Sequence, residues 1–167
     1  MSAQQPVEAW EIRRVPFTDV AAQQLIADVQ AEYTERYGSP DESPVDPGDF
    51  ELPAGSFYVG RLDGVPVATG AWRRSSVSAL GAGNSVEIKR MYVAPAARRR
   101  GLSRLMLAHL EESAGAAGAE VMVLETGIRQ PEAIALYLAS GYTEVPGFGH
   151  YSDSPLSRCF AKLLSRT

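Results

Sequence analysis

Residues 85–107, SVEIKRMYVAPAARRRGLSRLML, decide the fold, because they join a strand to a helix through a short basic loop. The apolar residues of the strand segment are spaced by two, three and two positions; they are Val86, Ile88, Met91 and Val93. Strict strand alternation would not skip a position. The pattern therefore predicts a β-bulge near Lys89 and Arg90, which would leave backbone groups unpaired.

A second strand follows the helix. Apolar residues recur at helical spacing from Gly101 to about Gly115, and a continuous apolar run, EVMVLETG at residues 120–127, comes next. Such a run is typical of a strand that is buried on both faces. Two strands joined by one helix form a βαβ unit, so we expect them to lie parallel.

The segments on either side add further strands and helices. Strand composition marks residues 10–15, 142–145 and 157–164, and two apolar runs around the turn Asp63-Gly64 predict a hairpin. One helical pattern occupies about residues 18–38, and Thr18 or Asp19 could cap its start. A second occupies about residues 131–141, where Pro131 suits the first turn and Gly141 the C-terminal cap. Residues 38–53 are rich in Pro, Asp, Glu and Ser and predict an acidic loop.

Composition limits the possible functions. The 167 residues suit a single domain spanning residues 1–167, of which we expect 1–9 to be flexible. The net charge of −4 disfavours a general nucleic-acid binder, because such a protein depends on excess positive charge. No apolar run approaches the roughly 20 residues that span a membrane, and a signal-peptide pattern is absent. With a single cysteine, Cys159, which suits a core position, and two histidines, we expect a cytoplasmic protein that holds no metal.

The basic loop has the donors that an anion needs. A helix N-terminus presents free N–H groups and a partial positive charge, and Gly101 allows a ligand to approach the backbone. The surrounding arginines are Arg98, Arg99, Arg100 and Arg104. The loop fits neither the GxxxxGK[ST] nor the GxGxxG pattern. From these residues alone, a site for a small phosphorylated ligand and a merely solvated helix start are both open.

At this loop the chain resembles the GNAT superfamily of acetyl-CoA-dependent N-acetyltransferases. Residues 98–103, RRRGLS, match the family motif [QR]-x-x-G-x-[GA] except at the last place, where Ser103 stands. Residues 130–142 match a second motif, N-x-x-A-x-x-x-Y-x-x-x-G-[FY], with Gln130 in place of Asn. Ser103 can still donate to a phosphate oxygen, and Gln130 keeps the amide on a longer arm. The resemblance covers roughly residues 65–164.

The resemblance implies a single α/β domain of the α+β kind. Its mixed, mostly antiparallel sheet would have six to seven strands, with one central parallel pair splayed around the cofactor and helices on both faces. It implies acetyl-CoA (coenzyme A) as cosubstrate, no metal, and transfer of the acetyl group to a primary amine by direct attack through a tetrahedral intermediate. The implied cofactor-binding residues are Met91, Tyr92, Val93, Arg98, Arg99, Arg100, Gly101, Leu102, Ser103, Arg104 and Gln130. Among these, the Met91 N–H would stabilise the oxyanion.

The resemblance also implies two catalytic residues. Tyr137 would protonate the leaving thiolate, since its ordinary pKa of about 10 lies above the roughly 8.5 of a thiol. Alternatively, Tyr137 is a plain core residue at helical spacing. Glu87 would take the ammonium proton through water, and here the alternatives are a solvated carboxylate or a partner of Lys89. Glu125 is a weaker rival for the base.

The acceptor is not identified by the sequence. We expect a small-molecule amine, with a slight preference for cationic amines from the acidic balance, and a protein N-terminus or lysine as the alternative. His150 and Tyr151 are candidates for the acceptor side, and Arg73 or Arg74 for an acceptor carboxylate. The acidic loop could attract a cation or be simply solvated, and His109 is predicted to lie on a helix surface.

Two functional classes stay open. The first is an N-acetyltransferase, and the second is a catalytically silent acyl-CoA-binding GNAT module that acts as a sensor or interaction domain. We expect neither a nucleic-acid partner nor a membrane partner, and the chain would be a monomer or a homodimer.

Overall fold

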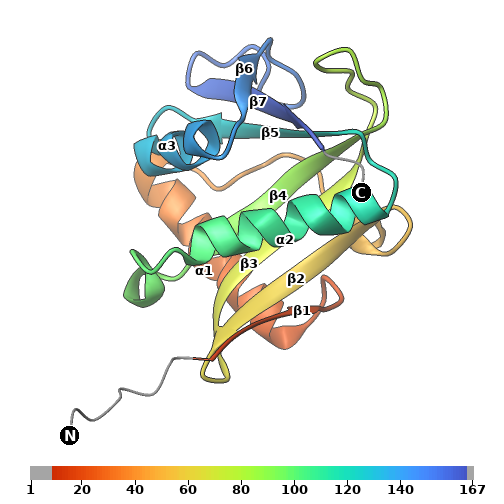
Figure 1. Cartoon of the computed structure of the whole chain (residues 1–167). Helices are drawn as coiled ribbons and strands as arrows, with labels where there is room; N and C mark the ends of the chain where they lie inside the picture. Colours follow the sequence, from red (N-terminus) through yellow and green to blue (C-terminus); the bar gives the residue numbers. More distant parts are fainter. Residues whose placement is uncertain (1–8, 165–167) are drawn as a thin grey trace, which may run out of the picture.

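The computed structural model describes residues 9–164, so residues 1–8 of the segment expected to be flexible lie outside the described residues. The described chain forms a seven-stranded sheet in the order β1-β2-β3-β4-β5-β7-β6 (Figure 1). The strands are β1 (Trp10–Arg14), β2 (Gly55–Leu62), β3 (Val65–Ser75), β4 (Ser85–Val93), β5 (Val121–Gly127), β6 (Thr143–Val145) and β7 (Ser157–Leu163). Each strand lies where the sequence predicted one, and Asp63 and Gly64 form the predicted hairpin turn with positive φ values of 50° and 81°.

Strands β4 and β5 form a parallel pair, as the βαβ pattern predicted. Their register runs only from Ser85 opposite Val121 to Glu87 opposite Val123, whereas β4 stays paired with β3 as far as Val93. The other neighbouring strands pair antiparallel. Beyond Glu87 the parallel strands therefore separate, and the second half of β4 leaves its β5-facing edge without a strand partner in the described sheet.

The predicted bulge lies in this second half of β4. The β3–β4 register shifts between Thr69 and Ala71, so that Gly70 stands opposite both Arg90 and Met91. Arg90 adopts a positive φ of 57°, which accommodates the extra residue. The irregular apolar spacing in the sequence had this physical cause.

Helices cover both faces of the sheet (Figure 1). Helix α1 (Val20–Tyr37) lies on one face, and α2 (Leu102–Ala116) and α3 (Pro131–Ala139) pack on the other. Asp19 caps α1, because its side chain accepts a hydrogen bond from the Ala22 N–H at 3.1 Å. Within residues 9–164, no helix is both long enough and apolar enough to cross a membrane.

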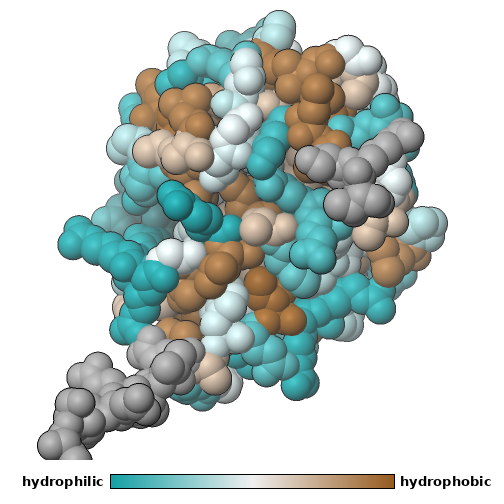
Figure 2. All heavy atoms as spheres, viewed as in Figure 1, coloured by the Kyte–Doolittle hydropathy of each residue, from teal (hydrophilic) through white to brown (hydrophobic). Residues whose placement is uncertain are grey.

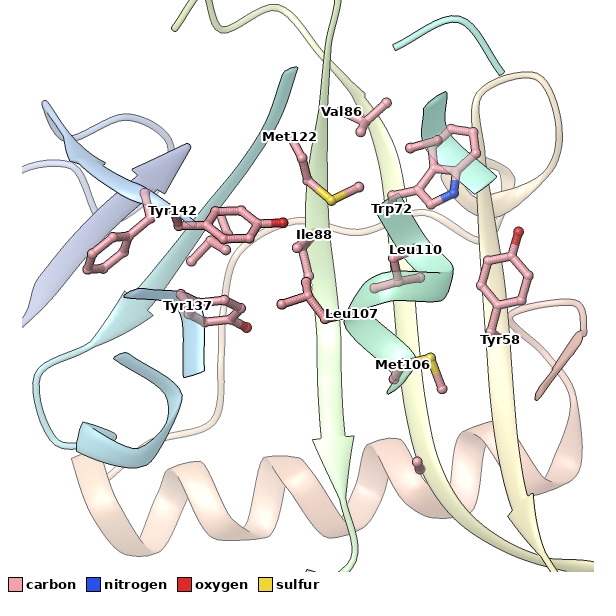
Figure 3. Packing of buried hydrophobic residues seen from close by; sticks show 14 of the residues in the cluster. Tyr58, Trp72, Val86, Ile88, Met106, Leu107, Leu110, Met122, Tyr137 and Tyr142 are labelled. Atoms are coloured by element: carbon pink, nitrogen blue, oxygen red, sulfur yellow. The ribbon is translucent and has the colours of Figure 1, made fainter. Parts of the chain in front are cut away.

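The layer between the sheet and α2 is the larger part of the core. Trp72, Val86, Met106 and Met122 are fully buried in it (Figure 3). Burial of each such side chain adds about 1.5–3 kcal/mol to the free energy of unfolding. A Cβ on Gly70 would lie 2.7 Å from the Met106 Cγ, so the glycine opposite the bulge lets α2 approach the sheet closely. The start of α2 is thereby fixed beside the point where β4 and β5 separate.

Candidate active site

The loop between β4 and α2 exposes backbone donors. Arg99 and Gly101 have positive φ values of 66° and 77°, and Gly101 is the N-cap of α2. The first N–H groups of the helix, from Leu102 to Arg104, have no intrahelical acceptor, and Gly101 has no side chain that could accept from them. A Cβ on Gly101 would meet no heavy atom within 4 Å, so a ligand can approach this backbone.

The arginines at this loop, Arg98, Arg99, Arg100 and Arg104, are all exposed. The guanidinium of Arg98 donates to the Glu32 carboxylate at 2.6 Å and to the Val93 carbonyl oxygen at 2.9 Å. Figure 2 shows hydrophilic side chains projecting beside the start of α2. Helix N–H groups, exposed guanidinium groups and the half-buried hydroxyl residue Ser103 are a donor set that fits a diphosphate.

Tyr137 of α3 lies beside the separated strands. It is 5% exposed, and its ring packs edge-to-face on Tyr142 with centroids 5.5 Å apart. Figure 3 shows it between α3 and Ile88 of β4. Burial, with a smaller contribution from the nearby Tyr33, raises the pKa of Tyr137 above its ordinary value. Tyr137 is thus a core residue that also keeps its proton at neutral pH.

Two cavities meet on the α1 side of the sheet. The first, of about 240 Å³, is lined by the end of α1, by residues 125–127 and by residues 151–157 of the β6–β7 connection. The second, of about 420 Å³, is lined by residues 73–77 of the β3 end, by residues 43–49 of the acidic loop and by residues 148–150. Glu125 lines both cavities.

Glu87 lies in the wall of the second cavity and is held by Arg73. Its Oε1 accepts a hydrogen bond from Arg73 Nε at 3.1 Å and forms an ion pair with Arg73 Nη2, also at 3.1 Å. The same guanidinium donates to Asp49 at 3.1 Å and to the Pro44 carbonyl oxygen at 2.8 Å. The partner of Glu87 is therefore Arg73, not Lys89. Arg74 donates to backbone oxygens of neighbouring loops, and both arginines line the second cavity.

Asp41 anchors the acidic loop to the bulged strand. Its carboxylate accepts from Arg90 at 2.7 Å and from Ser43, and it lies 3.6 Å from the Lys89 ammonium. Burial opposes ionisation of Asp41, but the charge of Lys89, the hydrogen bonds from Ser43 and the charge of Arg90 outweigh it and lower its pKa to about 2. This part of the loop is therefore paired rather than solvated.

Glu125, at the end of β5, has the opposite environment. Its Oε2 lies 4.0 Å from the Cys159 Sγ, and Cys159 is a buried core residue as expected. Burial raises the pKa of Glu125 to about 7, with a further increase from the charge of Glu87, while Lys89 lowers it. A carboxyl group with this pKa can bind and release a proton near neutral pH.

The candidate acceptor residues His150 and Tyr151 lie at the cavities. Tyr151 lines the first, where its hydroxyl accepts from the Glu42 N–H at 2.7 Å, and His150 lines the second. Their rings meet edge-to-face at 4.6 Å. His109, by contrast, is half-buried with its ring 4.6 Å from that of Tyr58, so it is not a plain surface residue.

Gln130 is placed at the first cavity. Its Oε1 accepts from the Tyr37 hydroxyl at 3.3 Å, and both residues line the cavity together with Tyr33. That it binds the cofactor stays a prediction. Sequence reasoning did not identify Tyr33, Tyr37 or the anchoring role of Asp41. The basic pair at the bulge was the one available signal, because it required acidic partners from elsewhere.

Comparison with known proteins decides the family. Residues 22–142 match the Acetyltransferase (GNAT) family, which is more than half of the chain. The chain belongs to the GNAT family. It is an acyltransferase of this family. The predicted fold is confirmed as well, because β4 and β5 form the single parallel pair of the sheet within the described residues.

Individual GNAT relatives cover nearly the whole chain. The Azospirillum brasilense protein named IAA acetyltransferase is 34% identical over 152 residues, which are 91% of this chain and 95% of that protein. A Klebsiella pneumoniae structure assigned as an acyl-CoA N-acyltransferase is 31% identical, with a TM-score of 0.76 over 93% of this chain and 98% of its own. The Salmonella typhimurium yncA structure, solved with its cofactor acetyl-CoA, is 24% identical, with a TM-score of 0.68 over 95% of this chain and 96% of its own.

Proposed function

We propose that the chain is an N-acetyltransferase that moves an acetyl group from acetyl-CoA to a primary amine of a small molecule, by direct attack on the thioester. One observation carries this proposal. An open set of anion donors at the start of α2 and two carboxylate-lined cavities lie on the two sides of the separated β4–β5 pair. A cofactor held at the first region could present its thioester to an amine in the second.

The cofactor side would hold the diphosphate and the pantetheine arm. Gly101, Leu102 and Ser103 would donate backbone N–H groups to phosphate oxygens, and the exposed arginines would add charge. Met91 to Val93 offer the unpaired edge of β4 to the arm. The relative yncA, solved with acetyl-CoA, supports this assignment.

Two groups would stabilise charge as the thioester reacts. The extra residue of the bulge frees the Met91 region from regular pairing with Gly70, which supports its N–H as the oxyanion donor. Tyr137 would give its proton to the departing thiolate, and its burial supports this role because the hydroxyl stays protonated. The resemblance implies Glu87 as the base, and its ion pair with Arg73 argues against that role.

The residues on the acceptor side support a small cationic amine as the substrate. The first cavity, about 240 Å³, is lined by Tyr33, Tyr37 and Tyr151, whose ring faces attract cations. Asp41 and Glu125 add carboxylates to the same wall. The relative named IAA acetyltransferase supports a small-molecule substrate over a protein one.

The test is an amine panel with thiol detection of released CoA. The panel should include small cationic amines, amino acids, aminoglycosides, polyamines and a peptide with a free N-terminus, each with acetyl-CoA at neutral pH. We expect CoA release with at least one small cationic amine and an acetylated product of matching mass. Tight binding of acetyl-CoA without release across the panel would instead support a silent acyl-CoA-binding module.

A further inference from the structure

We propose that Glu125 on β5, rather than Glu87 on β4, accepts the ammonium proton of the acceptor amine. This inference rests on the proposed function, because it names the base for that same transfer. The two carboxylates lie on the two parallel strands that separate at the site, and they differ in their partners.

Glu125 stands where an incoming amine can reach it. It lines both cavities and is half-buried, and residues of α1, of the acidic loop and of the β6–β7 connection form the walls around it. Its carboxylate lies 4.0 Å from the Cys159 Sγ and interacts with the Ser157 side chain, and no ion pair is found for it within residues 9–164. A carboxylate in such a place can bind the cation of the substrate.

Glu87 is engaged by the protein itself. Arg73 holds its Oε1 through one hydrogen bond from Nε and an ion pair with Nη2, both at 3.1 Å, and Asp49 and the Pro44 carbonyl oxygen hold the same guanidinium. Protonation of Glu87 would weaken this network. A base must release its protein partners to take the substrate proton in each turnover, and Glu87 would have to give up its contacts with Arg73 to do so.

Asp41 is excluded by the same argument. Lys89, Arg90 and Ser43 all stabilise its ionised form, and its pKa of about 2 leaves it a very weak base at neutral pH. Two carboxylates in one cavity with pKa values shifted in opposite directions mark different roles. Of the two, only Glu125 titrates near neutrality.

The groups that face Glu125 come from several elements. Lys89 and Glu87 approach from β4, Asp41 from the acidic loop, and Cys159 from β7. Burial and the two acidic neighbours raise the pKa of Glu125 to about 7, and the charge of Lys89 and the side chain of Ser157 on β7 oppose them. An approaching ammonium ion adds a positive charge, which favours the ionised form that must take the proton.

The protons of the transfer then balance. The ammonium nitrogen gives one proton to the Glu125 carboxylate, and its freed electron pair forms the bond to the thioester carbon. The carbon–sulfur bond breaks, and the sulfur takes the Tyr137 proton. The second proton lost by the nitrogen returns to the Tyr137 oxygen through water, and Glu125 releases its proton to solvent. The amine thus loses two protons, of which one ends on CoA and one in water.

The test compares Glu125→Gln with Glu87→Gln in pH profiles of kcat/KM, using one good acceptor. The wild type should gain activity about tenfold per pH unit below pH 7 and level off above it, as a single base requires. Glu125→Gln should lose about 10²–10³-fold in kcat/KM at pH 7, and its kcat/KM should keep rising above pH 7 because only the free amine then reacts. Glu87→Gln should keep the wild-type plateau above pH 7. A plateau that persists in Glu125→Gln but disappears in Glu87→Gln would overturn the proposal.

Thermal unfolding gives a second readout that does not depend on activity. The pKa of Glu125 is raised from 4.5 to about 7, so the folded protein binds this proton more tightly than the unfolded chain. The corresponding stability is present below pH 4.5 and is lost as the pH rises through about 7. Glu125→Gln should therefore match the wild-type Tm at pH 4.5 and exceed it at pH 8, whereas Glu87→Gln should lower the Tm at pH 8.

A lower Tm for Glu125→Gln at pH 8 would show that the carboxylate has a stabilising cation partner, and would overturn the proposal. Failure of the proposed function is distinct from this result. It would appear as a wild type that releases no CoA with any amine at any pH, while the inference fails when the wild type is active and Glu125→Gln keeps its full rate.

Discussion

The cofactor side and the acceptor side of the separated strands are built in different ways. The anion donors come from one continuous stretch, residues 98–104, and from the backbone of one helix start. The acceptor cavities are assembled from α1, the acidic loop, the end of β5 and the β6–β7 connection. A ligand part common to a whole family can be bound by a local backbone motif, whereas an individual acceptor needs side chains gathered from distant segments.

The two sides also differ in charge. The cofactor side presents exposed arginines, and the acceptor side presents carboxylates, of which Asp41 is neutralised by Lys89 and Arg90 while Glu125 is not. The amine is thus attracted to a region separate from the anionic cofactor. Variants that affect one side and leave the other unchanged test this division.

The largest effect is expected at the junction of the two sides. Tyr137→Phe should lower kcat by about 10²–10⁴-fold, since it removes the proton donor to the thiolate. The Kd of acetyl-CoA, measured by calorimetry, should stay within a few fold because the packing of the ring is kept. An unchanged kcat would make Tyr137 a packing residue, with water as the acid.

Tyr142→Phe is the matched control for this experiment. Tyr142 is buried against the same ring at 5.5 Å, and its hydroxyl donates to Glu111 at 3.1 Å. Lys162 also pairs with Glu111, so loss of the hydroxyl should cost only about 0.5–1.5 kcal/mol of stability. Its kcat should remain near the wild-type value.

A smaller effect is expected on the acceptor side alone. Asp41→Asn removes the charge that holds the acidic loop to Lys89 and Arg90, so the KM for the amine should rise about tenfold, the equivalent of roughly 1.4 kcal/mol. The KM for acetyl-CoA should not change by more than about twofold. Steady-state kinetics with each substrate varied in turn measures both values, and equal rises in both would remove the division between the sides.

The same variant has a defined pH signature. The pKa of Asp41 is lowered from 3.8 to about 2, so its contribution to stability is present above pH 3.8 and is lost as the pH falls through about 2. Denaturation at pH 5 and pH 2.5 should show wild type more stable than Asp41→Asn at pH 5 and a smaller difference at pH 2.5. An equal difference at both values would argue that the carboxylate charge does not hold the loop.

The smallest effect is expected for a single exposed charge on the cofactor side. Arg104→Gln should raise the Kd of acetyl-CoA by only a few fold, because an exposed ion pair contributes about 0.2–1 kcal/mol. The KM for the amine should be unchanged. Arg14→Gln, an exposed arginine on the edge strand β1, is the control and should leave both values as they are.

Much of the fold could be predicted because its signals are local. The strand and helix positions, the parallel pair and the bulge near Arg90 all followed from apolar spacing and turn residues, and the structure confirms them. The helix start at Gly101 could be predicted for the same reason, since the donors and the glycine are adjacent in sequence.

The acceptor side could not be predicted in the same way. The pairing of Glu87 with Arg73 joins two strands, and that of Asp41 with Arg90 joins residues 49 positions apart, so no spacing in the sequence shows either. The choice between Glu87 and Glu125 also depends on which carboxylate has a cation partner in space. The composition of the acidic loop did not show that Asp41 pairs with Lys89 and Arg90 or that Asp49 pairs with Arg73.

The most direct test of the whole account is calorimetric binding of acetyl-CoA to Gly101→Val and Gly118→Val. Both glycines have positive φ, 77° and 95°, and a Cβ on either meets no protein atom within 4 Å, so the two substitutions strain opposite ends of α2 similarly. Only Gly101 lies at the proposed diphosphate site. We predict at least a tenfold weaker binding, a loss of about 1.4 kcal/mol or more, for Gly101→Val and near wild-type binding for Gly118→Val. Equal affinities for the two folded variants would contradict the placement of the cofactor.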